Sequence, residues 1–138
     1  MTTHTTINTP ADVVVKSTAT NYQTLITAGQ HQFTADEPRS MGGQGSAPAP
    51  YDYILAGLGS CTTMTLKMYA DRKGWDLGEI NLALNLSKDA DGKSHVERIL
   101  SISQSIDDHQ WERLLDIASK TPVTKTLLAS MSISTRRA

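Results

Sequence analysis

The sequence predicts an α+β fold, formed by one domain over residues 1–138. Three observations support this class. Strand-like segments come before and after one long helical segment, two further helical segments follow a hairpin, and strands and helices do not alternate in the way that a parallel sheet requires. At this length the chain can bury a core without a metal or a disulfide.

Residues 11–35 indicate a small antiparallel sheet. Val13-Val14-Val15 is a β-branched run, residues 22–27 form a second candidate strand, and Gly29 separates it from a third candidate, Gln30-His31-Gln32-Phe33.

Residues 37–50 are rich in glycine and proline and contain too few apolar groups to pack, so we expect a surface loop. Gly42-Gly43-Gln44-Gly45 could form an anion-binding nest. No strand precedes it and no GK[ST] follows, so a flexible loop is the favoured interpretation.

The segment from Pro50 to Gly74 predicts one long, mostly buried helix. Pro50 suits the first helical turn, where its missing N–H costs nothing. Gly74 suits the C-terminal cap, and Arg72-Lys73 complements the carbonyl end of the helix dipole.

Apolar residues then alternate with polar ones from Ile80 to Leu86, and Asp89-Ala90-Asp91-Gly92-Lys93 predicts a turn into a second strand over residues 96–106. This pattern indicates a hairpin with one apolar face.

Two short helices and a closing strand are expected next. Asp107-Asp108 caps a helix whose apolar residues recur at helical spacing: Trp111, Leu114, Leu115 and Ala118. Thr121-Pro122 begins a further helix, and Met131-Ser132-Ile133 alternates as a strand.

Composition excludes several classes of function. The 13 Lys and Arg residues balance the 14 Asp and Glu residues and are scattered, which disfavours nucleic acid binding. No apolar run approaches the roughly 20 residues of a membrane span. The polar start, residues 1–10, does not resemble a signal peptide, and the single cysteine cannot form an intrachain disulfide, so we expect a cytoplasmic protein.

The single cysteine, Cys61, is the main candidate for chemistry. It lies about ten residues inside the helix, too far from the helix N-terminus for the dipole to favour a thiolate. No charged residue of the same helix shares its stripe, so activation must come from elsewhere in the fold. The alternative is a small buried packing residue. Gly57 and Gly59 permit a ligand to approach beside the thiol, or tight packing against a second helix.

The other candidates are weaker. Asp52 could be a site carboxylate, although a favourable charge at a helix N-terminus is the stronger interpretation. We expect no metal site, because the histidines have no metal-ligand spacing and the chain has no second cysteine, and we also expect no cofactor. These histidines are His4, His31, His95 and His109.

Several motifs together carry a family resemblance that spans nearly the whole chain. They are Ala35-Asp36-Glu37-Pro38, Pro50-Tyr51-Asp52, the run from Leu58 to Leu66 around Cys61, the run from Tyr69 to Trp75, and the segment from Leu114 to Leu127. In these motifs the chain closely resembles the OsmC/Ohr superfamily of thiol-dependent hydroperoxide reductases.

The resemblance implies an OsmC-like fold: antiparallel sheets wrapped around a central buried helix, in an intertwined homodimer with two pockets at its interface. It also implies that Cys61 attacks the O–O bond of an organic hydroperoxide and becomes a sulfenic acid.

This chain departs from the family pattern in its site. Thr121 stands where active relatives carry a second cysteine, and Asp52 replaces the usual glutamate. The activating arginine that relatives typically carry on an N-terminal strand is also missing, because Lys16 is the only cation before Arg39. These departures exclude the usual two-cysteine route.

We therefore predict a one-cysteine peroxidase in oxidative-stress defence. Cys61 reduces a small organic hydroperoxide, Arg39 or Lys16 supplies positive charge, Asp52 orients that cation, and an external thiol is the reductant. The alternative is a catalytically degenerate dimer that binds a small apolar ligand.

Overall fold

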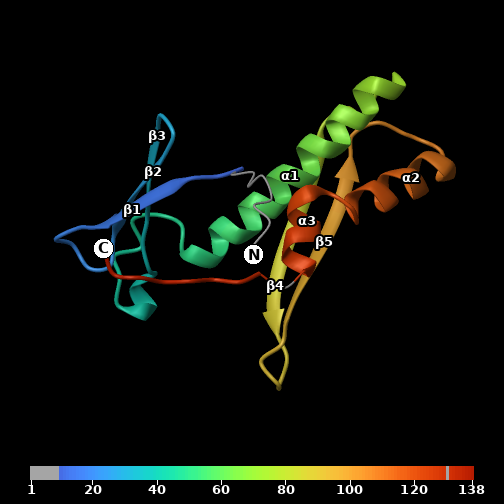
Figure 1. Ribbon diagram of the computed structural model, residues 1–138. Coiled ribbons are helices and arrows are strands. Elements are labelled where there is room, and N and C mark those ends of the chain that lie inside the picture. Colours follow the sequence, from blue (N-terminus) through green and yellow to red (C-terminus); the bar gives the residue numbers. More distant parts are fainter. Residues whose placement is uncertain (1–9, 130) are drawn as a thin grey trace, which may run out of the picture. The chain divides into compact units, whose positions relative to one another are not determined.

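The structure is a computed structural model that describes residues 10–129 and 131–138, and the chain divides into two compact units, one up to Tyr53 and one from Ile54 onward (Figure 1). Each unit is described by itself. One domain over residues 1–138 stays a prediction.

The first unit contains the expected N-terminal sheet. β1 (Val13–Ser17), β2 (Thr24–Ala28) and β3 (His31–Ala35) pair antiparallel in the order β1-β2-β3. Gly29, at φ 61°, forms the tight turn between β2 and β3. The three predicted strands are confirmed, although the second begins two residues later than the sequence indicated, at Thr24.

The loop after β3 is built around the carboxylate of Asp36, which is only 2% exposed. Its Oδ2 accepts hydrogen bonds from the amides of Gln44 (3.2 Å) and Ser46 (3.1 Å) and from Ser46 Oγ (2.7 Å), and Oδ1 accepts from the amide of Glu37 (2.8 Å). These bonds, led by that from the Ser46 side chain, lower the pKa of Asp36 to about 2.

The same loop includes a short 3₁₀ turn, η1 (Arg39–Met41), and leaves no room for a side chain at Gly43. A Cβ atom there would lie 2.1 Å from the carbonyl oxygen of Glu37. The glycine-rich run was predicted to be a flexible loop. Within this run the amide of Gln44 donates to Asp36, whereas the amides of Gly43 and Gly45 donate to the carbonyls of Pro38 and Glu37. The chain's own carboxylate therefore helps to hold the loop, and its flexibility stays a prediction.

The second unit combines most of the long helix with a hairpin and two short helices. α1 (Pro50–Lys73) begins in the first unit and continues into the second, where β4 (Ile80–Lys88) and β5 (Ser94–Ile102) pair antiparallel. α2 (Asp108–Ala118) and α3 (Pro122–Leu128) follow. Within this unit α1 runs beside the hairpin (Figure 1).

The core of the second unit lies where α1, α2 and the hairpin meet. α1 buries one face of residues at helical spacing: Leu58, Gly59, Thr62, Leu66 and Ala70. Leu66 and Ala70 pack with Leu77 and with Leu114 of α2. The opposite face of α1 carries Met64 and Met68, both more than half exposed within the single chain.

The predicted caps of the short helices are confirmed. Asp107 accepts a hydrogen bond from the Gln110 amide at 2.7 Å, and Gln110 Oε1 accepts one from the Asp107 amide at 3.0 Å, which completes a capping box. Thr121 caps α3, with Pro122 in its first turn. Both helices therefore begin at the residues that the sequence indicated.

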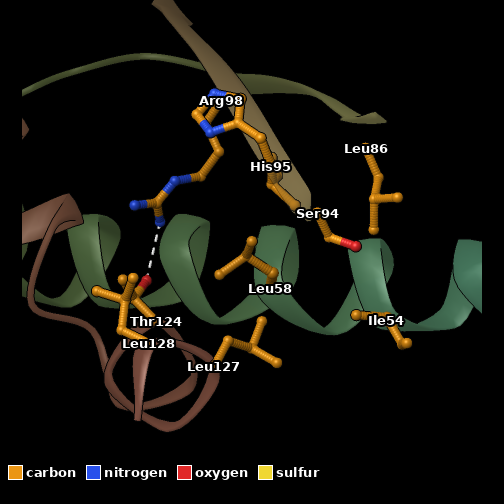
Figure 2. Close-up of a pocket in the computed structure, with 10 residues that line it drawn as sticks. Ile54, Leu58, Leu86, Ser94, His95, Arg98, Thr124, Leu127 and Leu128 are labelled. Atoms are coloured by element: carbon orange, nitrogen blue, oxygen red, sulfur yellow. Dashed lines mark hydrogen bonds between the residues drawn. The ribbon is translucent and has the colours of Figure 1, made fainter. Parts of the chain in front are cut away.

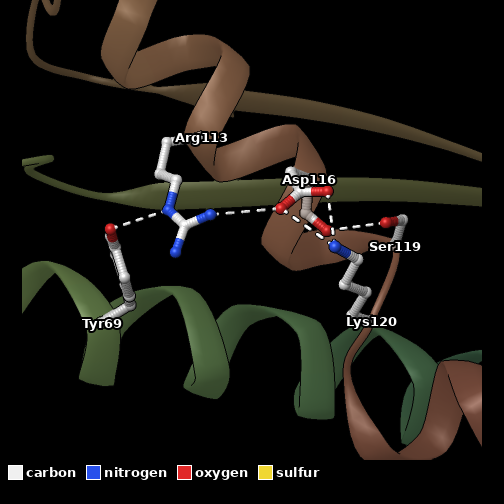
Figure 3. A network of polar contacts seen from close by, with 5 residues as sticks. All are labelled: Tyr69, Arg113, Asp116, Ser119 and Lys120. Atoms are coloured by element: carbon white, nitrogen blue, oxygen red, sulfur yellow. Dashed lines mark hydrogen bonds and ion pairs between the residues drawn. The ribbon is translucent and has the colours of Figure 1, made fainter.

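A polar network on the surface links α1 to α2 (Figure 3). Arg113 Nε donates to the Tyr69 hydroxyl at 3.0 Å, and Arg113 Nη1 lies 3.3 Å from Asp116 Oδ2. Lys120 Nζ lies 3.0 Å from Asp116 Oδ1. Exposed ion pairs of this kind contribute about 0–1 kcal/mol each, so the apolar core remains the main stabilising contact.

The predicted closing strand at residues 131–133 is wrong. These residues are not in a strand, and Met131 and Ile133 are 60% and 87% exposed. Three alternating residues do not make a strand without a partner that takes up their backbone hydrogen bonds. Within the described ranges, no helix is both long and apolar enough to cross a membrane.

Candidate functional site

Cys61 lies on α1 at the edge of the buried helical face. Its side chain is half-buried, between the fully buried Thr62 and the exposed Ser60. Among the residues that the structure describes, none forms a hydrogen bond with the Cys61 sulfur within its own unit. The thiol is thus neither sealed in the core nor fixed by a hydrogen bond inside the second unit.

The three residues predicted to assist Cys61 all lie in the first unit, and they do not pair with one another there. Lys16 is exposed on β1, and Arg39 is exposed in η1, where its Nε donates to the Gln44 carbonyl at 3.4 Å. Asp52 Oδ2 accepts a hydrogen bond from the Ala49 amide at 2.9 Å. No ion pair between Asp52 and either cation occurs in residues 10–53.

The two glycines of α1 have different surroundings. A Cβ atom at Gly59 would lie 2.8 Å from Leu84 Cδ1 of β4, so this glycine lets the helix approach the hairpin closely. A Cβ atom at Gly57 would have open space around it among the described residues. Gly59 is therefore a packing residue, as the second interpretation held, but its neighbour is a strand and not a helix.

The second unit also contains a cation that the sequence interpretation did not single out. Arg98 of β5 is half-buried, and its Nη1 donates to Thr62 Oγ1 at 3.0 Å and to Thr124 Oγ1 at 2.9 Å. Thr62, the immediate neighbour of Cys61, lies on α1, and Thr124 lies on α3. A single guanidinium thus links three elements.

Further hydroxyl groups extend this cluster. Thr62 donates its own proton to the Leu58 carbonyl at 2.7 Å, so it is an acceptor toward Arg98. Thr124 Oγ1 lies 2.6 Å from Thr121 Oγ1. Thr121, which occupies the position expected of a second cysteine, is 1% exposed and is part of this buried network.

Arg98 has no carboxylate partner among the described residues. The ion pairs of the described chain involve Lys67, Arg113 and Lys120 only. Since both Nη1 hydrogens are directed to threonines, Nε and Nη2 have no protein acceptor in the described part of the chain. These two nitrogens form the edge of the guanidinium that fits a carboxylate with two parallel hydrogen bonds.

Arg98 borders two cavities of the second unit. The larger, of about 370 Å³, has a mainly apolar lining; its residues are Ile54, Leu58, Leu86, Ser94, His95, Val96, Arg98, Thr124, Leu127 and Leu128. The smaller, of about 180 Å³, is bordered by Arg98 on one side and by residues of α2 that include Leu115. Cys61 is absent from both linings.

Figure 2 shows the larger cavity with Arg98 and Thr124 at one end and Ile54 and Leu86 at the other. The cavity therefore has a charged end, whereas its other end is uncharged and places Ser94 beside the apolar Ile54 and Leu86. A signal for Arg98 was present in the sequence. Val96, Leu100 and Ile102 share its side of the alternating strand, so an arginine there faces the apolar side.

The comparisons with known proteins agree with this fold. The model of the family described as OsmC-like protein matches residues 43–136. No curated protein matches the chain at a significant level.

Solved structures are similar over most of the chain. An OsmC-like protein from Mycoplasma pneumoniae has a TM-score of 0.70 at 17% identity, covering 88% of this chain and 89% of that one. The organic hydroperoxide resistance protein OsmC from Legionella pneumophila has a TM-score of 0.62 at 18% identity, covering 86% and 89%. The organic hydroperoxide resistance protein OhrB of Bacillus subtilis has a TM-score of 0.58 at 22% identity, covering 86% and 90%.

At these identities the solved structures establish the fold, and the family model establishes membership. The α+β architecture with antiparallel sheets and a long helix, predicted from the sequence, is that of these structures. The chain belongs to the OsmC-like protein family.

Proposed function

We propose that the protein is a one-cysteine peroxidase that reduces small organic hydroperoxides through Cys61 in oxidative-stress defence. The observation that carries the proposal is a half-buried Cys61 on the long helix of an OsmC-like chain whose structural neighbours include organic hydroperoxide resistance proteins. A cytoplasmic homodimer is part of the proposal. Arg39, Lys16 and Asp52 are proposed to assist Cys61, a role that requires them to approach it from the first unit or from a partner subunit.

The chemistry needs one sulfur and two equivalents of an external thiol. The Cys61 thiolate attacks one peroxide oxygen, the O–O bond breaks, and the alcohol leaves after taking up a proton. Sulfur loses two electrons and becomes a sulfenic acid. One external thiol condenses with it, releasing water and leaving a mixed disulfide, and a second thiol releases Cys61 as the external disulfide forms.

Thr121 makes an internal disulfide impossible, because the chain has a single cysteine. The sulfenic acid therefore persists until an external thiol arrives, and further oxidation to sulfinic acid competes with its reduction. We expect slow turnover and progressive inactivation as the peroxide concentration rises.

Intact-mass measurement after a short treatment with cumene hydroperoxide tests the proposal. The wild-type chain is expected to gain one oxygen faster than free cysteine is oxidised at the same pH, and an added thiol is expected to reverse the gain. Cys61→Ser is the matched control, because oxygen that it still gains comes from the 5 methionines. An equal rate of oxygen uptake in the wild type and in Cys61→Ser would sink the proposal.

A second candidate function, a non-catalytic protein that binds a small apolar ligand, is favoured by one specific observation. The larger cavity has a volume of about 370 Å³, within the size range of ligand sites, and Cys61 does not line it. Ligand binding without peroxide reduction by the wild-type chain supports this candidate over the peroxidase.

A further inference from the structure

Arg98 is the feature of the second unit that the proposed peroxidase chemistry does not use. It occupies an inward position of β5, where Val96 and Leu100 on either side contribute apolar side chains. Placing a charged group against an apolar lining is unfavourable unless the charge is paired or hydrogen-bonded. The two threonine bonds hold the side chain in place but do not neutralise its charge.

The two bonds also fix the orientation of the guanidinium. Because Nη1 is bound to Thr62 on α1 and Thr124 on α3, the group cannot rotate without breaking a contact with one helix. The Nε and Nη2 edge is left for an acceptor from outside the described chain. A preorganised fork loses little conformational freedom when it binds, which favours a planar anion with two oxygens.

The rest of the cavity is suited to an apolar tail. Leu58 lies between the Arg98 end and the Ile54 end, and Leu127 and Leu128 of α3 border the same space (Figure 2). Leu128 is 80% exposed and Ile54 is 43% exposed within the single chain, so apolar surface remains to be covered. The ionisable side chains of the lining are Arg98 and His95, so the lining contains no carboxylate.

We propose that this cavity binds a monocarboxylate with an apolar chain, whose carboxylate pairs with Arg98 and whose tail extends toward Ile54 and Leu86. The site is separate from the chemistry of Cys61, which does not line the cavity. It therefore does not depend on the proposed peroxidase activity.

Calorimetric titration of the full chain with octanoate and with octanamide tests the site. The two probes have the same chain length, and only octanoate carries a charge. A charge-assisted pair is expected to make octanoate bind about tenfold more tightly or better, and added salt is expected to reduce the ratio. Equal affinity of the two probes, or no binding of octanoate by the folded wild type, overturns the proposal.

Point variants test whether Arg98 is the source of the preference for octanoate over octanamide. Arg98→Gln is expected to reduce the octanoate-to-octanamide ratio to about one, whereas Lys125→Gln is expected to leave it unchanged. Lys125 is a matched control, because it is an exposed cation on α3 that does not line the cavity. An unchanged ratio in Arg98→Gln contradicts the assignment.

Arg98→Gln could lose its fold, since Arg98 links three elements, so Leu128→Asp provides a second test. This residue is largely exposed, and a carboxylate placed there is expected to weaken octanoate binding while octanamide binding is retained. If Leu128→Asp instead turns a dimeric wild type into a monomer and octanoate never binds, a second copy of the chain covers the cavity and the proposal is wrong.

Cys61→Ser separates this inference from the proposed function. The variant is expected to lose peroxide-dependent oxidation of the thiol and to retain the octanoate preference. If Cys61→Ser loses both the thiol oxidation and the preference for octanoate over octanamide, the carboxylate site and the Cys61 site are one, and the proposal that they are separate is wrong.

Discussion

Replacing Thr62 with valine tests the hydroxyl network that holds Arg98. Thr62 is fully buried, and its Oγ1 accepts from Arg98 Nη1 at 3.0 Å while donating to the Leu58 carbonyl at 2.7 Å. Valine keeps the volume and removes the hydroxyl. The Leu58 carbonyl keeps its helical partner, the amide of residue 62, so the main loss is one hydrogen bond from a charged donor.

The expected loss of unfolding free energy in Thr62→Val can be compared with that of the same substitution at the neighbouring Thr63. A hydrogen bond to a charged group contributes about 1.5–3 kcal/mol. Arg98 is half-buried and water can replace part of the bond, so we expect Thr62→Val to lower the free energy of unfolding by about 1–2 kcal/mol. Thr63→Val is the control, because Thr63 Oγ1 also donates four residues back, to Gly59 at 2.8 Å, and forms no hydrogen bond with an arginine of the described residues. We expect Thr63→Val to change the free energy of unfolding by no more than about 0.5 kcal/mol.

Urea unfolding at one protein concentration, followed by circular dichroism, measures both variants in the wild-type and Arg98→Met backgrounds. In the wild type, Thr62→Val is expected to lower the free energy of unfolding more than Thr63→Val does. This difference is expected to disappear in the Arg98→Met background, because the bond between Arg98 and Thr62 is already absent there. A difference of the same size in both backgrounds would refute the role given to the arginine contact.

Two further predictions concern the core and the acidic loop. In the same urea assay, Leu114→Ala is expected to lower the free energy of unfolding by about 2–5 kcal/mol, because its side chain is fully buried. Leu115→Ala is expected to lower it by less than about 1 kcal/mol, because Leu115 is 56% exposed. Similar losses for the two variants would contradict the packing of α2. The pKa of Asp36 falls from 3.8 to about 2 on folding, so its contribution to stability is complete above 3.8 and is lost as the pH falls through about 2. The difference in unfolding free energy between wild type and Asp36→Asn is expected to be constant at higher pH and to shrink over that window, and a difference that does not change with pH would contradict the account of the loop.

Local patterns in the sequence predicted much of the fold. The long helix ends at Lys73 with Gly74 at φ 70°, and the caps at Asp107 and Thr121 are where the sequence indicated them, because capping depends on a few adjacent residues. The strand expected at residues 131–133 is absent, because a strand also needs a neighbour, which a pattern of three residues does not specify.

The site was harder to predict, because its contacts join residues far apart in the chain. Arg98 meets Thr62 and Thr124, which are 36 and 26 residues away in sequence. Its inward position could be inferred from strand alternation, but its hydroxyl partners could not. The loop around Asp36 is a shorter-range case: Gln44 and Ser46 lie only 8 and 10 residues from the carboxylate, but the loop pattern did not specify which amides would bind it.

The way Arg98 is held has a practical consequence for handling the protein. Hydroxyl groups fix the guanidinium without cancelling its charge, so the folded chain presents a permanent cation to whatever anion the solution contains. Acetate or citrate in a buffer would occupy such a place and shift the thermal melting midpoint upward by mass action, whereas chloride, which lacks paired oxygens, would shift it less. Preparations that differ only in buffer salt would then melt at different temperatures.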